Sequence, residues 1–484
     1  MTVDDKKHKV MDWVSLIILL SNNWLTLSGV VLVTTAALFW AFLLPTFLHG
    51  HTDNPYFGII LFMVIPGAFF LALLVMPLGI WLYWRKHRGD GTLSGTLPPI
   101  DLRNVAVRRL LLFLALTTFA NAMIGSQLSY RTVHYMESVS FCGQTCHTVM
   151  QPEFVAYQNS PHARVECVKC HIGPGASWFV KSKLDGVRQV IAVWLDTYSR
   201  PIPTPVHTLR PARETCETCH WPQKYGEDRV RVIPHYAEDE PNTRSNSVLL
   251  MRIGHGQTGP GIHGAHLDPG VEIWYRHEDE KRQKIPYVEK RKAGAQTVVY
   301  LAEGVNKEAL DRLPMRLMDC MDCHTRPSHS FELPSQAVNE AMEAGRIPVS
   351  LPFVKKKAVE ILNVRYSSHE EAAVGIPAAL RDYYRASHPD VLQSRQTDVD
   401  KAGQALLEIY VQNVFPRMNI NWGTYPNHIG HNDFPGCFRC HDERAGSNGK
   451  TVTQDCNTCH SLLAMEEPTP KILSDLGLIS NGTK

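Results

Sequence analysis

All twelve cysteines of the 484-residue chain lie in pairs, and a histidine follows the second cysteine of every pair. Numbered one to six in chain order, the motifs are Cys142–Cys146–His147, Cys167–Cys170–His171, Cys216–Cys219–His220, Cys320–Cys323–His324, Cys437–Cys440–His441 and Cys456–Cys459–His460. Cys-x-x-Cys-His is the attachment signal of c-type haem, in which both thiols form thioethers and the histidine becomes the proximal iron ligand. The sequence therefore predicts six covalently attached haems, of which the first has an irregular motif with one extra residue.

Zinc sites and disulfides are the alternatives for paired cysteines. Two Cys-x-x-Cys pairs could form a four-cysteine zinc site, and disulfides form in the same oxidising compartment as c-type haem. Neither alternative accounts for the histidine after every second cysteine. At the first motif a longer loop changes the thioether geometry, so a reduced or disulfide-bonded pair of Cys142 and Cys146 stays open there.

Six-coordinate irons would need six further axial ligands, and 17 of the 23 histidines lie outside the motifs. Histidines close to a motif suit ligation of a neighbouring haem in a packed chain, and the repeated spacing His263–His266 and His428–His431 would put two imidazoles close together on a helix. The candidates are His162, His207, His263, His266, His329, His428 and His431. The alternative for each is a surface or hydrogen-bonded histidine. Two histidines on one iron would close it to substrates, which favours electron transfer over chemistry at the haem.

Met150 is a separate candidate, because it lies three residues after His147. A methionine ligand would raise the potential of the first haem. The alternative is a methionine packed in the core.

Three uncharged runs precede the motifs, at 24–48, 57–84 and 110–128. Each is long enough to cross about 30 Å of hydrocarbon as a helix, although the third could also be a buried core helix. Lys and Arg lie before the first run and between the second and third, whereas the loop 49–56 carries neither. The positive-inside rule then places the N-terminus in the cytoplasm and the motifs outside, in the periplasm of a bacterial inner membrane. Covalent haem attachment outside the cytoplasm agrees with this topology.

The composition and patterning predict a mainly α protein with much loop and a small β insertion. Hydrophobic residues make up 44% of the chain, which excludes a disordered polymer, and the net charge of +2 excludes a strongly basic nucleic-acid binder. We expect a membrane anchor at 1–128, a tri-haem region at 129–230, a β-containing insertion at 231–319 and a second tri-haem region at 320–484.

Periodicity predicts individual elements in the outer region. The predicted helices are 151–158, 176–198, 336–344, 353–364, 368–387 and 398–414, and strand-forming residues occupy 271–276, 285–288 and 297–302. The tail after residue 464 is polar, so we expect it to be loosely ordered. With so many motifs, we expect the haems rather than aliphatic side chains to form the core.

Residues 110–225 resemble the NapC/NirT/NrfH family of membrane quinol dehydrogenases. The resemblance rests on a span that leads into the first motif and Met150, then Glu153-Phe-Val-Ala-Tyr, Ser160-Pro-His162 and the second motif. Later segments, including 322–329, 422–431 and 437–441, resemble the longer ImcH-like inner-membrane cytochromes of metal-reducing bacteria, which have seven motifs against six here. The family's first motif is shorter at two points and uses its methionine as the iron ligand, so either His147 or Met150 could bind here.

This resemblance implies a function and a substrate site. The family passes electrons from menaquinol, bound at the membrane surface beside the first haem, to periplasmic c-type cytochromes or a reductase in anaerobic or extracellular respiration. Its quinol site uses a lysine and an acidic residue after the second motif. In this chain these roles would fall to Lys183 with Asp185 or Glu153, with Arg164 nearby. The alternative is that these are solvated charges on a membrane-facing helix.

Two other functions stay open at this point. The chain could be a passive electron-transfer subunit of a larger complex without its own quinol site. It could also be a terminal reductase of a small molecule, which would need an iron without a distal ligand. The surplus of histidines argues against the terminal reductase.

Overall fold

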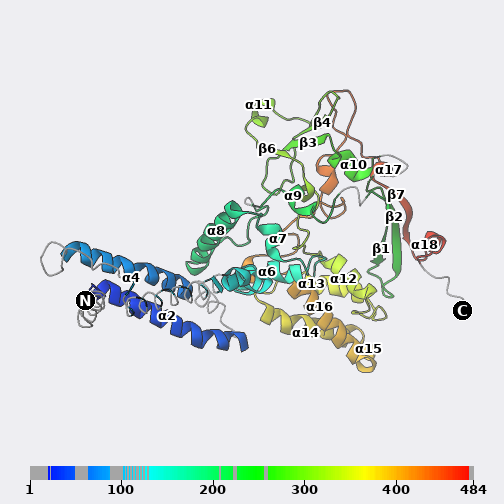
Figure 1. The fold of residues 1–484 in the computed structure, drawn as a ribbon. Coiled ribbons are helices and arrows are strands. Elements are labelled where there is room, and N and C mark those ends of the chain that lie inside the picture. The colour runs from blue at the N-terminus through cyan, green and yellow to red at the C-terminus, as the bar shows by residue number, and fades with distance from the viewer. Residues whose placement is uncertain are drawn as a thin grey trace, which may run out of the picture. The chain divides into compact units, whose positions relative to one another are not determined.

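The computed structural model describes residues 20–21, 23–49, 64–87, 102–103, 105, 108, 112, 115, 119, 123, 126–127, 130–145, 147–206, 209–221, 226–254 and 260–478. The chain divides into two compact units, residues 1–150 and 151–484 (Figure 1). The anchor predicted at 1–128 falls in the first unit.

Two long helices, α2 (Trp24–His49) and α4 (Ile65–His87), pack against each other in the first unit. Their contact uses small residues, because a Cβ on Gly29 would lie 2.6 Å from Met76 Cγ, and one on Gly79 would lie 2.5 Å from Thr26 Oγ1. Such glycines let the backbones of apolar helices approach closely. Gly29 opposite Met76 and Gly79 opposite Thr26 define an antiparallel pair.

The membrane prediction is supported in part. Within the described residues, α4 is long and apolar enough to cross a membrane, and Trp24–Phe39 of α2 is a shorter apolar stretch. These two helices match the predicted runs 24–48 and 57–84, of which the second begins before the described residues. Most of the third run, 110–128, lies outside the described residues, so three spans are not established.

Helices α12 to α16 form a bundle in the second unit. Their bounds are α12 (Pro334–Glu343), α13 (Val354–Leu362), α14 (His369–Ser387), α15 (Pro389–Ser394) and α16 (Gln396–Asn413). The apolar periodicity predicted four of them within a few residues, and Ser368 caps α14 as its side chain accepts from Glu371 N. Their core contains fully buried Leu380, Tyr384 and Leu406 but no motif cysteine. The expectation that haems replace an aliphatic core is therefore wrong for this bundle.

Two antiparallel sheets complete the second unit. The first has the order β1-β2-β7, from β1 (Arg229–Tyr236), β2 (Arg244–Met251) and β7 (His460–Glu467). The second has the order β5-β4-β3-β6, from β3 (Val271–Arg276), β4 (Tyr287–Lys292), β5 (Val298–Leu301) and β6 (Met315–Leu317). The predicted strand segments correspond to β3, β4 and β5.

The strand β7 corrects the expectation of a loose tail after residue 464. It pairs with β2, so that Met251 lies opposite His460. Ala464 packs with Val248 and with Leu473 of the short helix α18 (Lys471–Asp475). These three apolar residues are too widely spaced to give a periodic signal, and their burial becomes visible only once β2 lies alongside.

The remaining elements are helices, most of them short and many of them at or near the motifs. They are η2 (Phe141–Thr145), α6 (His147–Gln158), α7 (Cys167–His171), α8 (Ala176–Trp194), α9 (Ala212–Cys216), α10 (Gly261–Leu267), α11 (Lys307–Leu310), η4 (Cys320–Asp322), η5 (Pro416–Met418), η6 (Gly436–Arg439) and α17 (Cys456–Cys459). Asp319 and Asp455 cap the turns of the fourth and sixth motifs by accepting from the backbone N–H groups of Met321 and Asn457. In these two motifs the acidic residue directly before the first cysteine therefore fixes the attachment turn.

Candidate haem sites

Each of the five later motif histidines faces a second histidine from elsewhere in the chain. The ring-centroid distances are 6.2 Å for His171–His329, 5.9 Å for His220–His162, 6.5 Å for His324–His263, 5.9 Å for His441–His266 and 6.2 Å for His460–His431. Two imidazoles on opposite sides of one metal ion, each with a metal–nitrogen bond of about 2 Å, have centroids about 6 Å apart. The spacing of all five pairs therefore fits one iron between two histidines.

Backbone carbonyls orient several of these rings. His329 Nδ1 lies 2.9 Å from Glu153 O, His266 Nδ1 2.7 Å from Ile262 O, His441 Nδ1 2.8 Å from Thr453 O and His162 Nδ1 3.2 Å from Pro327 O. A metal-bound histidine usually donates its second ring N–H in this way, which fixes the tautomer and leaves Nε2 for the metal.

Burial also favours the neutral imidazole that binds a metal. It is the main cause of a lowered pKa at six paired histidines, namely His171, His263, His266, His324, His329 and His460. Neighbouring histidines lower the pKa further at His171 and His324. The residues present therefore suit a metal-centred group at these five positions.

The opposing histidine comes from a different part of the chain than the motif it faces. His162, just before the second motif, faces the third, and His329, just after the fourth, faces the second. The short helix α10 supplies His263 to the fourth motif and His266 to the fifth. Each pair thus ties distant segments together.

The start of α10 depends on Gly261. Its φ is +60°, and a Cβ there would lie 2.3 Å from Gly254 O. Only glycine tolerates both conditions. Beyond it, His263 N donates to Ile253 O over 2.7 Å, and Arg252 N donates to Cys459 O over 2.9 Å. The end of β2 therefore holds both α10 and the sixth motif.

The five described motifs follow one another in space in chain order. Helix α7 of the second motif contacts α9, and α9 contacts η4 of the fourth motif. The Cys216 and Cys320 thiols share a hydrogen bond, which raises the pKa of Cys216 and lowers that of Cys320. Cys437 of the fifth motif acts electrostatically on Cys323 of the fourth and on Cys459 of the sixth. Consecutive attachment points are therefore neighbours in space from the second motif to the sixth.

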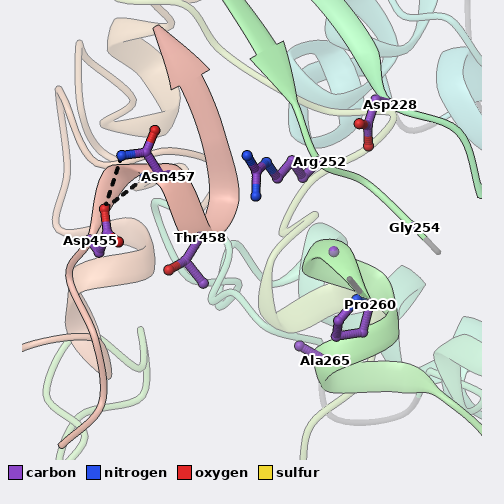
Figure 2. A pocket seen from close by; sticks show the side chains of 9 residues that line it. Asp228, Arg252, Gly254, Pro260, Ala265, Asp455, Asn457 and Thr458 are labelled. Atoms are coloured by element: carbon purple, nitrogen blue, oxygen red, sulfur yellow. Dashed lines mark hydrogen bonds between the residues drawn. The ribbon is translucent and has the colours of Figure 1, made fainter. Parts of the chain in front are cut away.

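A cavity of about 360 Å³ lies between α10 and the sixth motif (Figure 2). Its lining includes Asp228, Arg252, Ala265, Asn457 and Thr458. Arg252 presents a guanidinium group to this space, which suits a carboxylate such as a haem propionate. Within the described part of the chain, Asp228 Oδ1 and His460 Nδ1 are buried without a hydrogen-bond partner. These two polar atoms suit a polar or metal-centred group bound beside the motif.

His428 has a different environment from the one predicted. It is 4% exposed, its Nδ1 lies 3.1 Å from Asp322 O, and its Nε2 lies 2.6 Å from Gln283 Nε2. Burial lowers its pKa to about 4. Both ring nitrogens are engaged within the protein in this arrangement, unlike those of a paired histidine, and the predicted role of His428 as an iron ligand stays a prediction. His207 lies outside the described residues.

The ligands of the first motif stay a prediction. Cys146 and the side chain of His147 lie outside the described residues, and Met150 is half-buried on α6.

The residues predicted for a quinol site separate into two groups. Lys183 and Asp185 lie on α8, both half-buried, and Arg164 is exposed in the loop before the second motif. Glu153 is instead tied to Arg326, with Oε2 2.6 Å from Arg326 Nη2 and only 13% and 11% of the two side chains exposed. The same carboxylate oxygen lies 3.5 Å from His329 Nδ1. Glu153 therefore supports the histidine that faces the second motif.

Sequence reasoning missed the charged residues that hold the attachment loops. Arg326 stacks over the Tyr425 ring at 3.9 Å besides binding Glu153. Asp322 and Arg439 lie between the cysteines of the fourth and fifth motifs and are 1% and 9% exposed. A charged residue inside a Cys-x-x-Cys spacer is a signal that could have identified both.

Repeated attachment motifs with opposing histidines define a multihaem c-type cytochrome. The N-terminal region of the NapC/NirT cytochrome c family matches residues 105–202. Over 451 residues the chain is 41% identical to the cytochrome c-type protein ImcH of Geobacter sulfurreducens, covering 92% of this chain and 88% of that protein. No solved structure matches. The chain belongs to the NapC/NirT family of c-type cytochromes and is ImcH-like.

Proposed function

We propose that this cytochrome oxidises menaquinol at the periplasmic surface of the inner membrane and passes the electrons through six haems to a periplasmic acceptor. The observation that supports the relay is the set of five histidine pairs, one at each motif from the second to the sixth. Bound haem supplies one-electron redox chemistry there, and the protein supplies position and electrostatics.

The chain's own residues have three tasks in this proposal. The cysteines of each motif would hold a haem and the paired histidines would ligate its iron, which would favour electron transfer over substrate binding. The Glu153–Arg326 pair holds His329 in its orientation. Lys183 on α8 would hold a quinol oxygen, and an acidic group, either Asp185 or Glu153, would accept the proton.

The membrane helices support a membrane location. Helix α4 has the length and composition of a span, and its last turn carries Arg85 and Lys86, as expected for a cytoplasmic end. We therefore propose three spans with the haem region in the periplasm, the third span being the run 110–128.

The test is anaerobic reduction of the purified protein in lipid nanodiscs by a reduced menaquinol analogue, followed by haem absorbance. We expect reduction that a quinone-site inhibitor blocks and that Lys183→Gln or Asp185→Asn slows at least tenfold, which is about 1.4 kcal/mol of barrier. Lys357→Gln is the control, because Lys357 forms an exposed ion pair with Glu360 in the helical bundle.

No reduction by the quinol analogue, with dithionite still reducing every haem, would contradict a quinol site in this chain. That outcome would favour the passive electron-transfer subunit, in which a partner oxidises the quinol. The terminal reductase has less support, since five motif histidines already face a second histidine.

A further inference from the structure

Helix α8 exposes a continuous apolar stripe. Along it, Val180, Leu184, Val187, Ile191 and Trp194 are 55%, 68%, 47%, 49% and 81% exposed. At 3.6 residues per turn these five positions span about 80° of the helix circumference. A surface helix of a soluble protein turns such a stripe toward its core. In α8 the stripe faces outward instead, so it lacks the cover that an apolar face requires.

Basic residues flank the stripe on both sides. On the helical wheel Lys183 lies about 60° from the stripe centre on one side, and Arg188 lies about 80° from it on the other. Lys181 lies about 100° from the stripe centre, on the same side as Arg188. The single acidic residue of α8, Asp185, lies about 140° from the stripe centre. An apolar face bordered by cations, with a tryptophan in the last turn, is the arrangement of a helix that lies in a lipid interface.

We propose that α8 lies in the plane of a membrane surface, with its apolar stripe among the acyl chains and its basic residues on anionic lipid headgroups. The charge pattern selects this occupant, because a lipid surface offers apolar depth bordered by negative charge along the whole helix. The covalent chain tethers α8 to the unit that contains α2 and α4, since α8 begins 26 residues after the end of that unit.

This inference rests on the proposed membrane location and deepens the proposed quinol site. Lys183 is at the edge of the stripe and Asp185 lies one half-turn further round, away from it. A quinol that diffuses within the bilayer would therefore meet Lys183 at the lipid boundary, whereas Asp185 would receive its proton on the aqueous side of the helix.

Single cysteine substitutions test the proposal in the full-length protein. Once all twelve native thiols are in thioether bonds, an introduced cysteine is the one reactive thiol. We would compare Leu184→Cys, Val187→Cys and Ile191→Cys with Gln189→Cys, which lies about 180° from the stripe centre. The readout is the rate of modification by a water-soluble maleimide, measured by intact mass in phosphatidylglycerol-containing nanodiscs.

We expect the three stripe positions to react at least about tenfold more slowly than Gln189→Cys, because lipid excludes the reagent and disfavours the thiolate. Lys181→Glu with Arg188→Glu should reduce this protection in anionic nanodiscs and leave it unchanged in phosphatidylcholine alone. A diazirine-bearing phospholipid should crosslink to the stripe cysteines.

Equal reaction rates at all four positions would overturn the proposal. Protection of the stripe without lipid crosslinking would also overturn it, since a partner protein or a second copy would then cover the face. Reduction of the haems by the quinol analogue is measured separately in the same nanodiscs, so that the two proposals can fail independently. Protection with no quinol reduction would therefore retain the interfacial helix and reject the quinol site.

Discussion

Arg439 Nη2 donates a hydrogen bond to the main-chain carbonyl of Asp322 over 2.7 Å, although 117 residues separate them in sequence. Each residue lies between the two cysteines of a motif, Asp322 in the fourth and Arg439 in the fifth. Arg439 Nη1 also donates to Arg282 O over 2.9 Å. The attachment loops of two neighbouring haem sites are thus joined by a buried polar contact.

The side-chain carboxylate of Asp322 has its own set of partners beside this contact and gives the first prediction. It accepts from Tyr275 Oη at 2.6 Å, Arg282 Nη1 at 2.6 Å and Arg316 Nε at 3.1 Å. Asp322→Asn would leave two guanidinium groups without their carboxylate beside the fourth motif. We expect the midpoint potential of one haem to rise, because extra positive charge stabilises the reduced form, and we expect a loss of stability of about 3–5 kcal/mol.

Arg316→Gln makes the opposite change at the same carboxylate and should lower the potential of that haem. Potentiometric titration of both variants measures the shifts, with Asp400→Asn, which breaks the Arg381–Asp400 pair of the helical bundle, as the control. Shifts of the same sign in both variants would contradict an electrostatic role and indicate a general loosening of the loop.

Two buried histidines give the second prediction, since His266 faces a motif histidine and His428 does not. His266→Ala should convert one haem to a high-spin ferric form, visible by electron paramagnetic resonance, and added imidazole should restore the low-spin signal. His428→Ala should lose stability without a high-spin signal, because its ring bonds Asp322 O and Gln283 instead of a metal. The reverse result would reassign the ligand.

The third prediction concerns Glu153. Glu153→Gln removes the charge that pairs with Arg326 and neighbours His329 Nδ1. A carboxylate beside a ligating histidine raises the basicity of that ligand, so the neutral variant should raise the potential of the second haem and shift its low-spin g values. Glu166→Gln, which alters an exposed pair with Lys169 near the same motif, should change neither.

The fourth prediction is a pH dependence of stability from Glu332. Burial, followed by the nearby Glu340, raises the pKa of Glu332 to about 7, while Arg346 opposes this shift. A carboxyl group with a raised pKa in the fold stabilises it while protonated, so this contribution is complete below pH ~4.5 and is lost as the pH rises through ~7. Glu332→Gln should raise the apparent unfolding temperature at pH 8 and change it little at pH 5. An equal change at both pH values would refute the assignment.

The features that could be predicted from the sequence are those that depend on residues close to one another along the chain. Apolar periodicity located α12, α13, α14 and α16, and the nearness of His162 and His329 to motifs identified them as ligand candidates. The sequence could not predict which motif each histidine faces, because His329 reaches the second motif across more than 150 residues.

The features that the sequence did not reveal have the same physical origin. His428 resembles His431 in sequence, but only the fold shows that Asp322 and Gln283 already occupy its ring nitrogens. The strand β7 shows little alternation, and its pairing with β2 rather than its own composition makes it a strand. Long-range contacts decide all of these features.

The most direct test of the account is the spin state of the irons in the oxidised protein. Electron paramagnetic resonance, quantified against total haem, should show low-spin ferric signals from all five haems of the second to sixth motifs. At most one haem, that of the irregular first motif, should be high-spin. Two or more high-spin haems per chain would contradict the proposal that His162, His263, His266, His329 and His431 complete the coordination of these irons.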